Sequence, residues 1–190
     1  MVVMADNHDQ CGEAPVWDPG AQCLYWSDCV GLRLYRYNWR TKQHKVLRQG
    51  IEVNGAALDV RGRLVISNND GIWYLDGAQA PQLIVSEAEG AKCQMNDCIA
   101  DPAGRLVAGS WFYDPENNYP LGSLMSVDTE GKATILDEGF HLANGLGFSP
   151  NAKTLYFADS AVRTIYAYDY RIDSGAVRNR RVFVRVPDSE

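Results

Sequence analysis

Four side chains with oxygen atoms recur at the same place in a repeated sequence pattern. They are Glu13, Asn54, Asn96 and Asn144. Each stands five residues before an anchor residue at the start of a turn, and the four anchors are Asp18, Asp59, Asp101 and Ser149. Calcium binds carboxylate and amide oxygens, whereas copper and zinc favour imidazole and thiolate groups. If the repeats bring these side chains together, the sequence predicts a site for a hard cation.

The anchors divide the chain into copies of one unit, with steps of 41, 42 and 48 residues between them. Each copy contains β-rich segments around its anchor and a later β-rich pair, joined by turn dipeptides such as Asp76-Gly77 and Glu130-Gly131. An inserted loop over 113–120 accounts for the longest step. Four short strands in about 42 residues are typical of one β-propeller blade. No segment keeps a helical apolar period, so we expect an all-β fold.

The chain is therefore predicted to be a single β-propeller domain over residues 1–190, with about four blades. The blades are expected at about residues 11–50, 51–92, 93–140 and 141–186. Four copies fit either a closed four-bladed ring or part of a larger ring. Rotation about an axis carries equivalent residues onto a ring, so the four candidate ligands should converge at one mouth of the central channel.

A simpler interpretation treats the same residues as parts of turns. Asn54-Gly55 and Asn144-Gly145 are common turn dipeptides, and Gly12-Glu13 fits an exposed bend. Their coincidence in register across four copies favours the shared site.

Composition and sequence pattern argue against some classes of partner and favour one cellular compartment. With a net charge of −6 and scattered basic residues, nucleic acid is not an expected partner. No apolar run approaches the roughly 20 residues of a membrane-spanning helix, and the N-terminal residues lack the pattern of a secretory signal, so we expect no membrane partner. The five cysteines contain no Cys-x-x-Cys pair, which favours reduced thiols packed as small apolar groups and a cytoplasmic location.

Three motifs carry a resemblance to a known family. They are Cys11–Asp18, Met95–Asp97 followed by Asp101–Arg105, and Asn144–Pro150 running into Leu155–Ser160. In this combination the chain resembles the SMP-30/gluconolactonase/LRE-like family, which includes regucalcin and bacterial sugar lactonases. The resemblance implies a six-bladed propeller with one divalent cation on its axis. It matches Glu13 and Asn144 to the family's metal ligands, and Asn96 to a residue beside the metal that contacts substrate.

Three departures from the family pattern concern the site. Gln94 stands where the family usually has an arginine, which changes recognition of hydroxyl or carboxylate groups. The family's acidic residue after the next strand falls near Asp114 or Glu116, inside the inserted loop. The family's third metal ligand, an aspartate that opens the fifth blade, would follow Glu190. We therefore expect the chain to be C-terminally incomplete, and its catalytic residue is not identified.

The function that the resemblance implies is metal-dependent hydrolysis of a sugar lactone to its aldonic acid, with the cation polarising the carbonyl for attack by water. The expected metal ligands are Glu13, Asn144, Asn96 and Asn54, and the expected substrate-binding residues are Gln94, Asn96 and Asp114. Calcium is the expected cation, with magnesium, manganese and zinc as alternatives. A non-catalytic binding propeller, a truncated fragment without activity, and a hydrolase of another ester remain open. Without a Gly-x-Ser-x-Gly motif, a serine hydrolase has little support.

Apolar residues on the β-rich segments should pack between the blades. The eight expected core residues are Trp17, Leu24, Leu58, Val65, Leu106, Phe148, Leu155 and Phe157. Asp159 follows the inner strand of the fourth copy, where it would either support the pocket or cap a turn.

Overall fold

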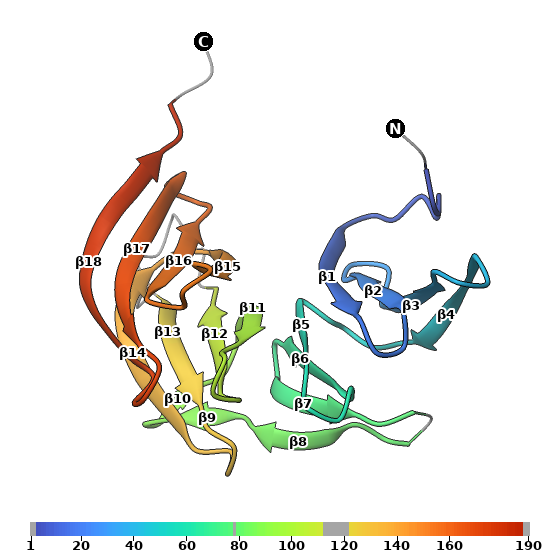
Figure 1. Ribbon diagram of the computed structural model, residues 1–190, viewed down its shortest axis with the longest axis horizontal. Helices are drawn as coiled ribbons and strands as arrows, with labels where there is room; N and C mark the ends of the chain where they lie inside the picture. The colour runs from blue at the N-terminus through green and yellow to red at the C-terminus, as the bar shows by residue number, and fades with distance from the viewer. Residues whose placement is uncertain (1–2, 78, 112–121, 188–190) are drawn as a thin grey trace.

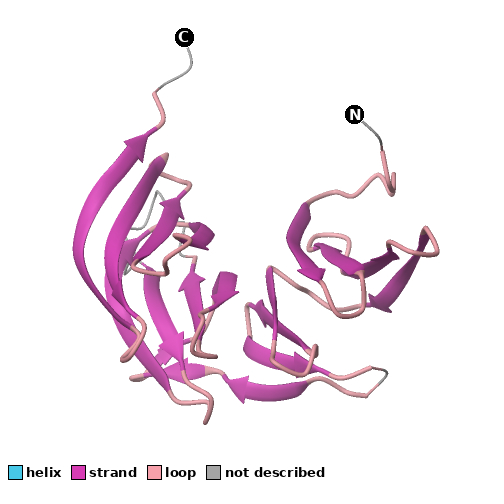
Figure 2. Ribbon diagram, in the orientation of Figure 1, coloured by secondary structure: helices cyan, strands magenta, loops and turns pink. Residues whose placement is uncertain are grey.

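The structure, a computed structural model, describes residues 3–77, 79–111 and 122–187. Within these ranges the chain forms β-strands joined by turns and has no helix (Figure 2). The described residues accordingly contain no helix that could cross a membrane. The prediction of an all-β fold is confirmed.

Most strands belong to four antiparallel sheets of four strands each, in which sequence order is also spatial order. The first sheet contains β1 (Gly12–Asp18), β2 (Cys23–Asp28), β3 (Arg33–Asn38) and β4 (Gln43–Gln49). The second contains β5 (Gly55–Leu58), β6 (Leu64–Asn68), β7 (Gly71–Leu75) and β8 (Gln82–Val85). The third contains β11 (Met95–Ala100), β12 (Leu106–Ser110), β13 (Gly122–Val127) and β14 (Ala133–Phe140). The fourth contains β15 (Ala143–Phe148), β16 (Thr154–Asp159), β17 (Thr164–Arg171) and β18 (Ala176–Arg185).

The four sheets follow one another around an arc, with the first strand of each towards the centre and the last towards the outside (Figure 1). Contacts join the inner strands in sequence, from β1 to β5, from β5 to β11 and from β11 to β15. A short hairpin of β9 (Glu87–Ala88) and β10 (Ala91–Lys92), which no sequence pattern predicted, lies between the second and third sheets. The four sheets are consecutive propeller blades. The assignment of residues 1–190 to a single domain stays a prediction.

Three apolar clusters fill the spaces between adjacent sheets and hold the arc together. Ile66 of the second sheet packs with Leu34 of the first, Met125 of the third packs with Ile72 of the second, and Phe157 of the fourth packs with Leu124 of the third; all six are fully buried. Full burial of such a side chain stabilises a fold by roughly 1.5–3 kcal/mol. The second and third sheets are therefore packed between two neighbours, and the first and fourth are each packed against one.

The core prediction is confirmed for most of its residues. Val65, Leu106, Leu155 and Phe157 are buried in these clusters. Leu58 and Phe148 are partly buried against them.

Trp17 is a correction, because 43% of its surface is exposed. The pairing of β1 with β2 shifts register between Glu13 and Val16, and it is Val16 that packs against the apolar cluster while Trp17 lines an open cavity. Leu24, the partner of Trp17 on β2, is only half-buried and belongs to none of the three clusters.

The repeated anchor residues hold the turn between the two innermost strands of each blade. In the second blade, Asp59 accepts hydrogen bonds from the backbone N–H of Arg61 (2.9 Å) and Arg63 (2.8 Å), and from Arg63 Nε (2.8 Å). Asp101 makes the same set of bonds with Ala103 and Arg105. The anchors recur because an acceptor there satisfies the turn's backbone donors, and they stand where each innermost strand ends.

Candidate functional site

Three of the four inner strands bulge at the candidate ligand positions. The ladder shifts register just after Glu13 in β1, around Asn96 in β11 and just after Asn144 in β15. A β-bulge turns side chains away from the regular alternation and increases the local twist. The second blade differs, because β5 begins at Gly55 and pairs with β6 in unbroken register. The same sequence phrase therefore has two backbone conformations.

Glu13 and Asn144 line one cavity of about 520 Å³. Glu13 comes from the first blade and Asn144 from the fourth, and the third blade adds Asp97 from β11. Trp17 and Ala56 are among the apolar residues of its wall. The structure thus brings the two residues that the resemblance matches to metal ligands to a single space at the centre of the arc.

Asn54 and Asn96 lie elsewhere and link neighbouring blades. The side-chain nitrogen of Asn54 donates to the Met95 carbonyl (3.2 Å), and that of Asn96 donates to the Ala143 carbonyl (2.7 Å). Each acceptor directly precedes the equivalent position of the next blade. Neither Asn54 nor Asn96 is among the cavity-lining residues, and Asn54 is only 8% exposed. Their nitrogens are committed to structure, and their role as metal ligands stays a prediction.

Asp97 is a site residue that the sequence analysis missed. Its Oδ1 accepts a hydrogen bond from the Cys98 backbone N–H (2.8 Å), and its Oδ2 accepts one from the Leu146 N–H on the next blade (3.3 Å). Burial raises the pKa of this carboxyl above its usual range, and backbone hydrogen bonds, including one from Gly145, oppose the rise. Asp97 therefore holds the bulge that carries Asn144.

The charge of Asp97 also acts on Glu13. Burial and then repulsion from Asp97 raise the pKa of the Glu13 carboxyl. Two carboxylates and an amide around one cavity are hard oxygen donors, and a divalent cation would relieve the repulsion between them. The chemistry of the donor set therefore fits a calcium-type cation better than zinc or copper. Among the described residues, no three His, Cys, Asp or Glu side chains cluster closely enough to hold a metal.

Gln94 and Asp159 are not among the residues that line this cavity. Gln94 is half-buried, and its backbone joins Trp111, whose N–H donates to the Gln94 carbonyl (3.2 Å). Asp114 and Glu116 lie outside the described residues. Asp159 is 1% exposed and accepts the backbone N–H groups of His141 (3.0 Å) and Leu142 (3.1 Å), so it caps the turn before β15.

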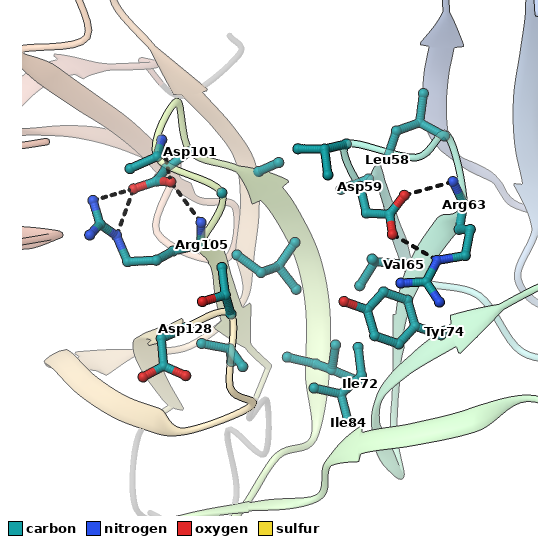
Figure 3. Close-up of a pocket in the computed structure, with 18 of the residues that line it drawn as sticks. Leu58, Asp59, Arg63, Val65, Ile72, Tyr74, Ile84, Asp101, Arg105 and Asp128 are labelled. Carbon is teal, nitrogen blue, oxygen red and sulfur yellow. Dashed lines mark hydrogen bonds and ion pairs between the residues drawn. The ribbon is translucent and has the colours of Figure 1, made fainter.

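A second cavity, of about 490 Å³, lies between the second and third blades at their anchor turns (Figure 3). The Asp59–Arg63 pair stands on one side of it and the Asp101–Arg105 pair on the other, above apolar side chains that include Ile72. Each guanidinium already binds the aspartate of its own turn. This cavity therefore offers paired charges. The cavity lined by Glu13, Asp97 and Asn144 has two carboxylates and, among the described residues that line it, no cationic side chain.

The model of the SMP-30/gluconolactonase/LRE-like region matches residues 11–190. The chain belongs to this family. It is 31% identical over 188 residues to the pentonolactonase XacC of Haloferax volcanii, and the matched region covers 98% of the chain and 62% of that protein. It is 31% identical over 159 residues to the 6-deoxy-6-sulfogluconolactonase of Pseudomonas putida, with 83% and 54% covered.

Solved structures agree with the family assignment. The gluconolactonase XC5397 from Xanthomonas campestris superposes with a TM-score of 0.81 at 27% identity, covering 95% of the chain and 65% of that structure. The chain thus spans less than two thirds of the length of these relatives. The described residues have the blade fold of these relatives.

Proposed function

We propose that this family member contributes the cation-binding part of an enzyme that hydrolyses sugar lactones to aldonic acids. The observation that carries the proposal is the meeting of Glu13, Asn144 and Asp97 at one cavity. Relatives named for lactone substrates, a pentonolactonase, a 6-deoxy-6-sulfogluconolactonase and a gluconolactonase, support the substrate class. Calcium is the cation that the oxygen donors favour, with magnesium, manganese and zinc as alternatives.

Glu13 and Asn144 would hold the cation through their side-chain oxygens. When bound, a divalent cation supplies Lewis-acid polarisation of the lactone carbonyl. Asp97 keeps the Asn144 bulge in position through the Leu146 N–H, and its charge increases the attraction for a cation. Trp17, with 43% of its surface exposed, provides an aromatic wall against which the apolar face of a sugar ring could pack. Gln94, Asn96 and Asp114 stay candidates for contacts with the sugar hydroxyl groups.

The proposal is tested by measuring calcium binding by calorimetry and acid release from a panel of aldonolactones, with and without a chelator. We expect calcium binding in the chain, lactone opening that the chelator stops, and loss of both in Glu13→Gln and Asn144→Ala. Glu130→Gln, which neutralises an exposed carboxylate on a distant turn, is the matched control. Calcium binding without acid release from any lactone would reject the hydrolase and favour a binding propeller. Full activity in both site variants would reject the site.

A further inference from the structure

Two cysteines face each other at the end of the first blade's inner hairpin. The β1–β2 ladder pairs Gly12 with Asp28, and the next step along it sets Cys11 opposite Cys29. The backbone confirms this step, because the Cys29 N–H donates to the Cys11 carbonyl (3.1 Å). Directly opposed residues of an antiparallel pair carry their side chains on the same face of the sheet. The two thiols are therefore neighbours.

These two cysteines differ from the other three in access and in company. Cys11 and Cys29 are half-buried, whereas Cys23, Cys93 and Cys98 are 5% exposed or less. Cys11 and Cys29 are therefore the thiols that a small oxidant in solution can reach.

We propose that Cys11 and Cys29 are an oxidation site that forms a disulfide, with Cys11 two residues before Glu13. Opposed residues have Cβ atoms roughly 4.5–5.5 Å apart, and a disulfide needs about 3.5–4.5 Å. Closing the bond therefore requires a movement of about 1 Å rather than a rearrangement of the blade. This goes beyond the expectation that all five thiols are inert apolar groups.

The oxidant is a hydroperoxide, with hydrogen peroxide as the simplest case. The Cys11 sulfur attacks a peroxide oxygen, the O–O bond breaks, and a sulfenic acid and one water are formed. The Cys29 sulfur then attacks the Cys11 sulfur, the S–O bond breaks, and a second water leaves as the S–S bond forms. The two thiols lose two protons and two electrons, and the peroxide is reduced to two waters.

The movement should reach β1, because Cys11 directly precedes this strand. Asp28, which is fully buried, accepts the N–H groups of Cys11 (3.1 Å) and Gly31 (2.9 Å) and binds Arg33 (2.6 Å). On β1, the residue after Glu13 is Ala14, whose φ of 53° lies in the left-handed region that costs a residue with a Cβ some strain. A pull on Cys11 is therefore transmitted to the bulge that aims Glu13. This consequence, unlike the disulfide itself, rests on the proposed function.

The disulfide is tested by adding one equivalent of hydrogen peroxide to the reduced chain and analysing intact mass and proteolytic peptides. We expect the loss of two hydrogens and one linked peptide pair that contains Cys11 and Cys29. The Cys29→Ser variant should lack the link and accumulate an oxidised Cys11, whereas Cys98→Ala, which removes a buried thiol, should keep it. Separate oxidation of the two thiols without a link, or a link to another cysteine, would overturn the assignment.

The coupling to Glu13 has its own measurement. Calcium affinity of the oxidised chain is expected to fall by about 10–100-fold relative to the reduced chain and to recover on reduction, which is the usual cost of disturbing the support of a metal ligand. The Cys29→Ser chain should bind calcium normally before and after peroxide. An unchanged affinity in the linked chain would overturn the coupling alone. If the reduced chain binds no calcium, the proposed function fails while the disulfide result stands.

Discussion

The inner strand of the second blade and those of the first and fourth blades share one sequence pattern but use its polar residue differently. In the second blade, Asn54 precedes a strand with unbroken register, is buried, and ties the blade to the Met95 carbonyl. In the first and fourth blades, Glu13 and Asn144 stand beside bulges and reach a shared cavity. Equivalence in a repeat therefore gives residues corresponding places along the backbone, but it does not decide whether the side chain serves the fold or the site.

The third blade combines both uses on adjacent residues. Asn96 makes the inter-blade tie to the Ala143 carbonyl, while Asp97 directs its carboxylate to the bulge of the fourth blade and to the cavity. A test of the comparison should therefore separate cation affinity from stability. Variants of the cavity residues should change cation affinity. Variants of Asn54 and Asn96, called the tie residues because they bond to the next blade, should change stability.

The largest effect is expected from Glu13→Gln, which removes a carboxylate from the cavity with little change in shape. Calcium affinity should fall on the order of 100-fold, because the charge of the ligands sets the affinity of such sites. The raised pKa of Glu13 shows that its charge is unfavourable in the cation-free fold, so the variant should be at least as stable as the parent without calcium. Calorimetry and thermal unfolding measure the two quantities. A strongly destabilised variant would place Glu13 with the tie residues.

Asp97→Asn should rank next, with calcium affinity lowered by about 10–100-fold. An amide can accept through only one atom, and its NH₂ group would meet the Leu146 N–H that Asp97 Oδ2 now accepts, so the bulge that carries Asn144 loses a support. Asp173→Asn, on an exposed turn, is the control for the loss of one negative charge. Equal calcium affinities of the two variants would contradict a role for Asp97 at the cavity.

Asn54→Ala should do the opposite and lower stability without touching the cavity. It removes the donor to the Met95 carbonyl at a buried site, which costs about 1–3 kcal/mol of unfolding free energy. Calcium affinity should stay within about twofold of the parent. Asn96→Ala, at the equivalent tie, is its companion and should lose a comparable amount of stability. Denaturant unfolding and calorimetry on both variants measure the two quantities, and a large loss of calcium affinity in Asn54→Ala would support Asn54 as a metal ligand.

Repeats and strand propensity made the architecture predictable from the sequence. Anchors such as Asp59 and Asp101 recur because each turn needs a hydrogen-bond acceptor at the same position, and this requirement is visible in the sequence as a repeated residue type. The β9–β10 hairpin was missed because it occurs in one blade only. Trp17 was wrongly placed in the core because a bulge reverses which of two neighbouring residues faces inward, and apolar alternation does not reveal a bulge.

The site was predictable only in part for the same reason. The four-fold register selected Glu13 and Asn144, which line the cavity, together with Asn54, whose side chain bonds to the next blade, because spacing alone does not distinguish these two directions. Asp97 escaped because its equivalents in the other copies are Ala14, Gly55 and Gly145. A comparison of repeats finds residues that recur, so it passes over a residue that is present in one copy only. Asp97 could have been recognised because it is a carboxylate at a position where the other copies have Ala or Gly.

The smallest expected effect is the pH dependence of the cation-free chain, compared between the parent and Glu13→Gln. The folded-state pKa of Glu13 is raised, so the fold binds this proton more tightly than the unfolded chain does. The stability that Glu13 contributes is fully present below its unfolded pKa, near 4.5, and is lost as pH rises through the raised folded pKa. The parent should therefore lose stability relative to the variant between acidic and neutral pH, as followed by denaturant unfolding. Saturating calcium should abolish this difference in slope, because a bound cation favours the ionised carboxylate. A slope that calcium leaves unchanged would mean that the charges of Glu13 and Asp97 repel each other at a place where no cation binds.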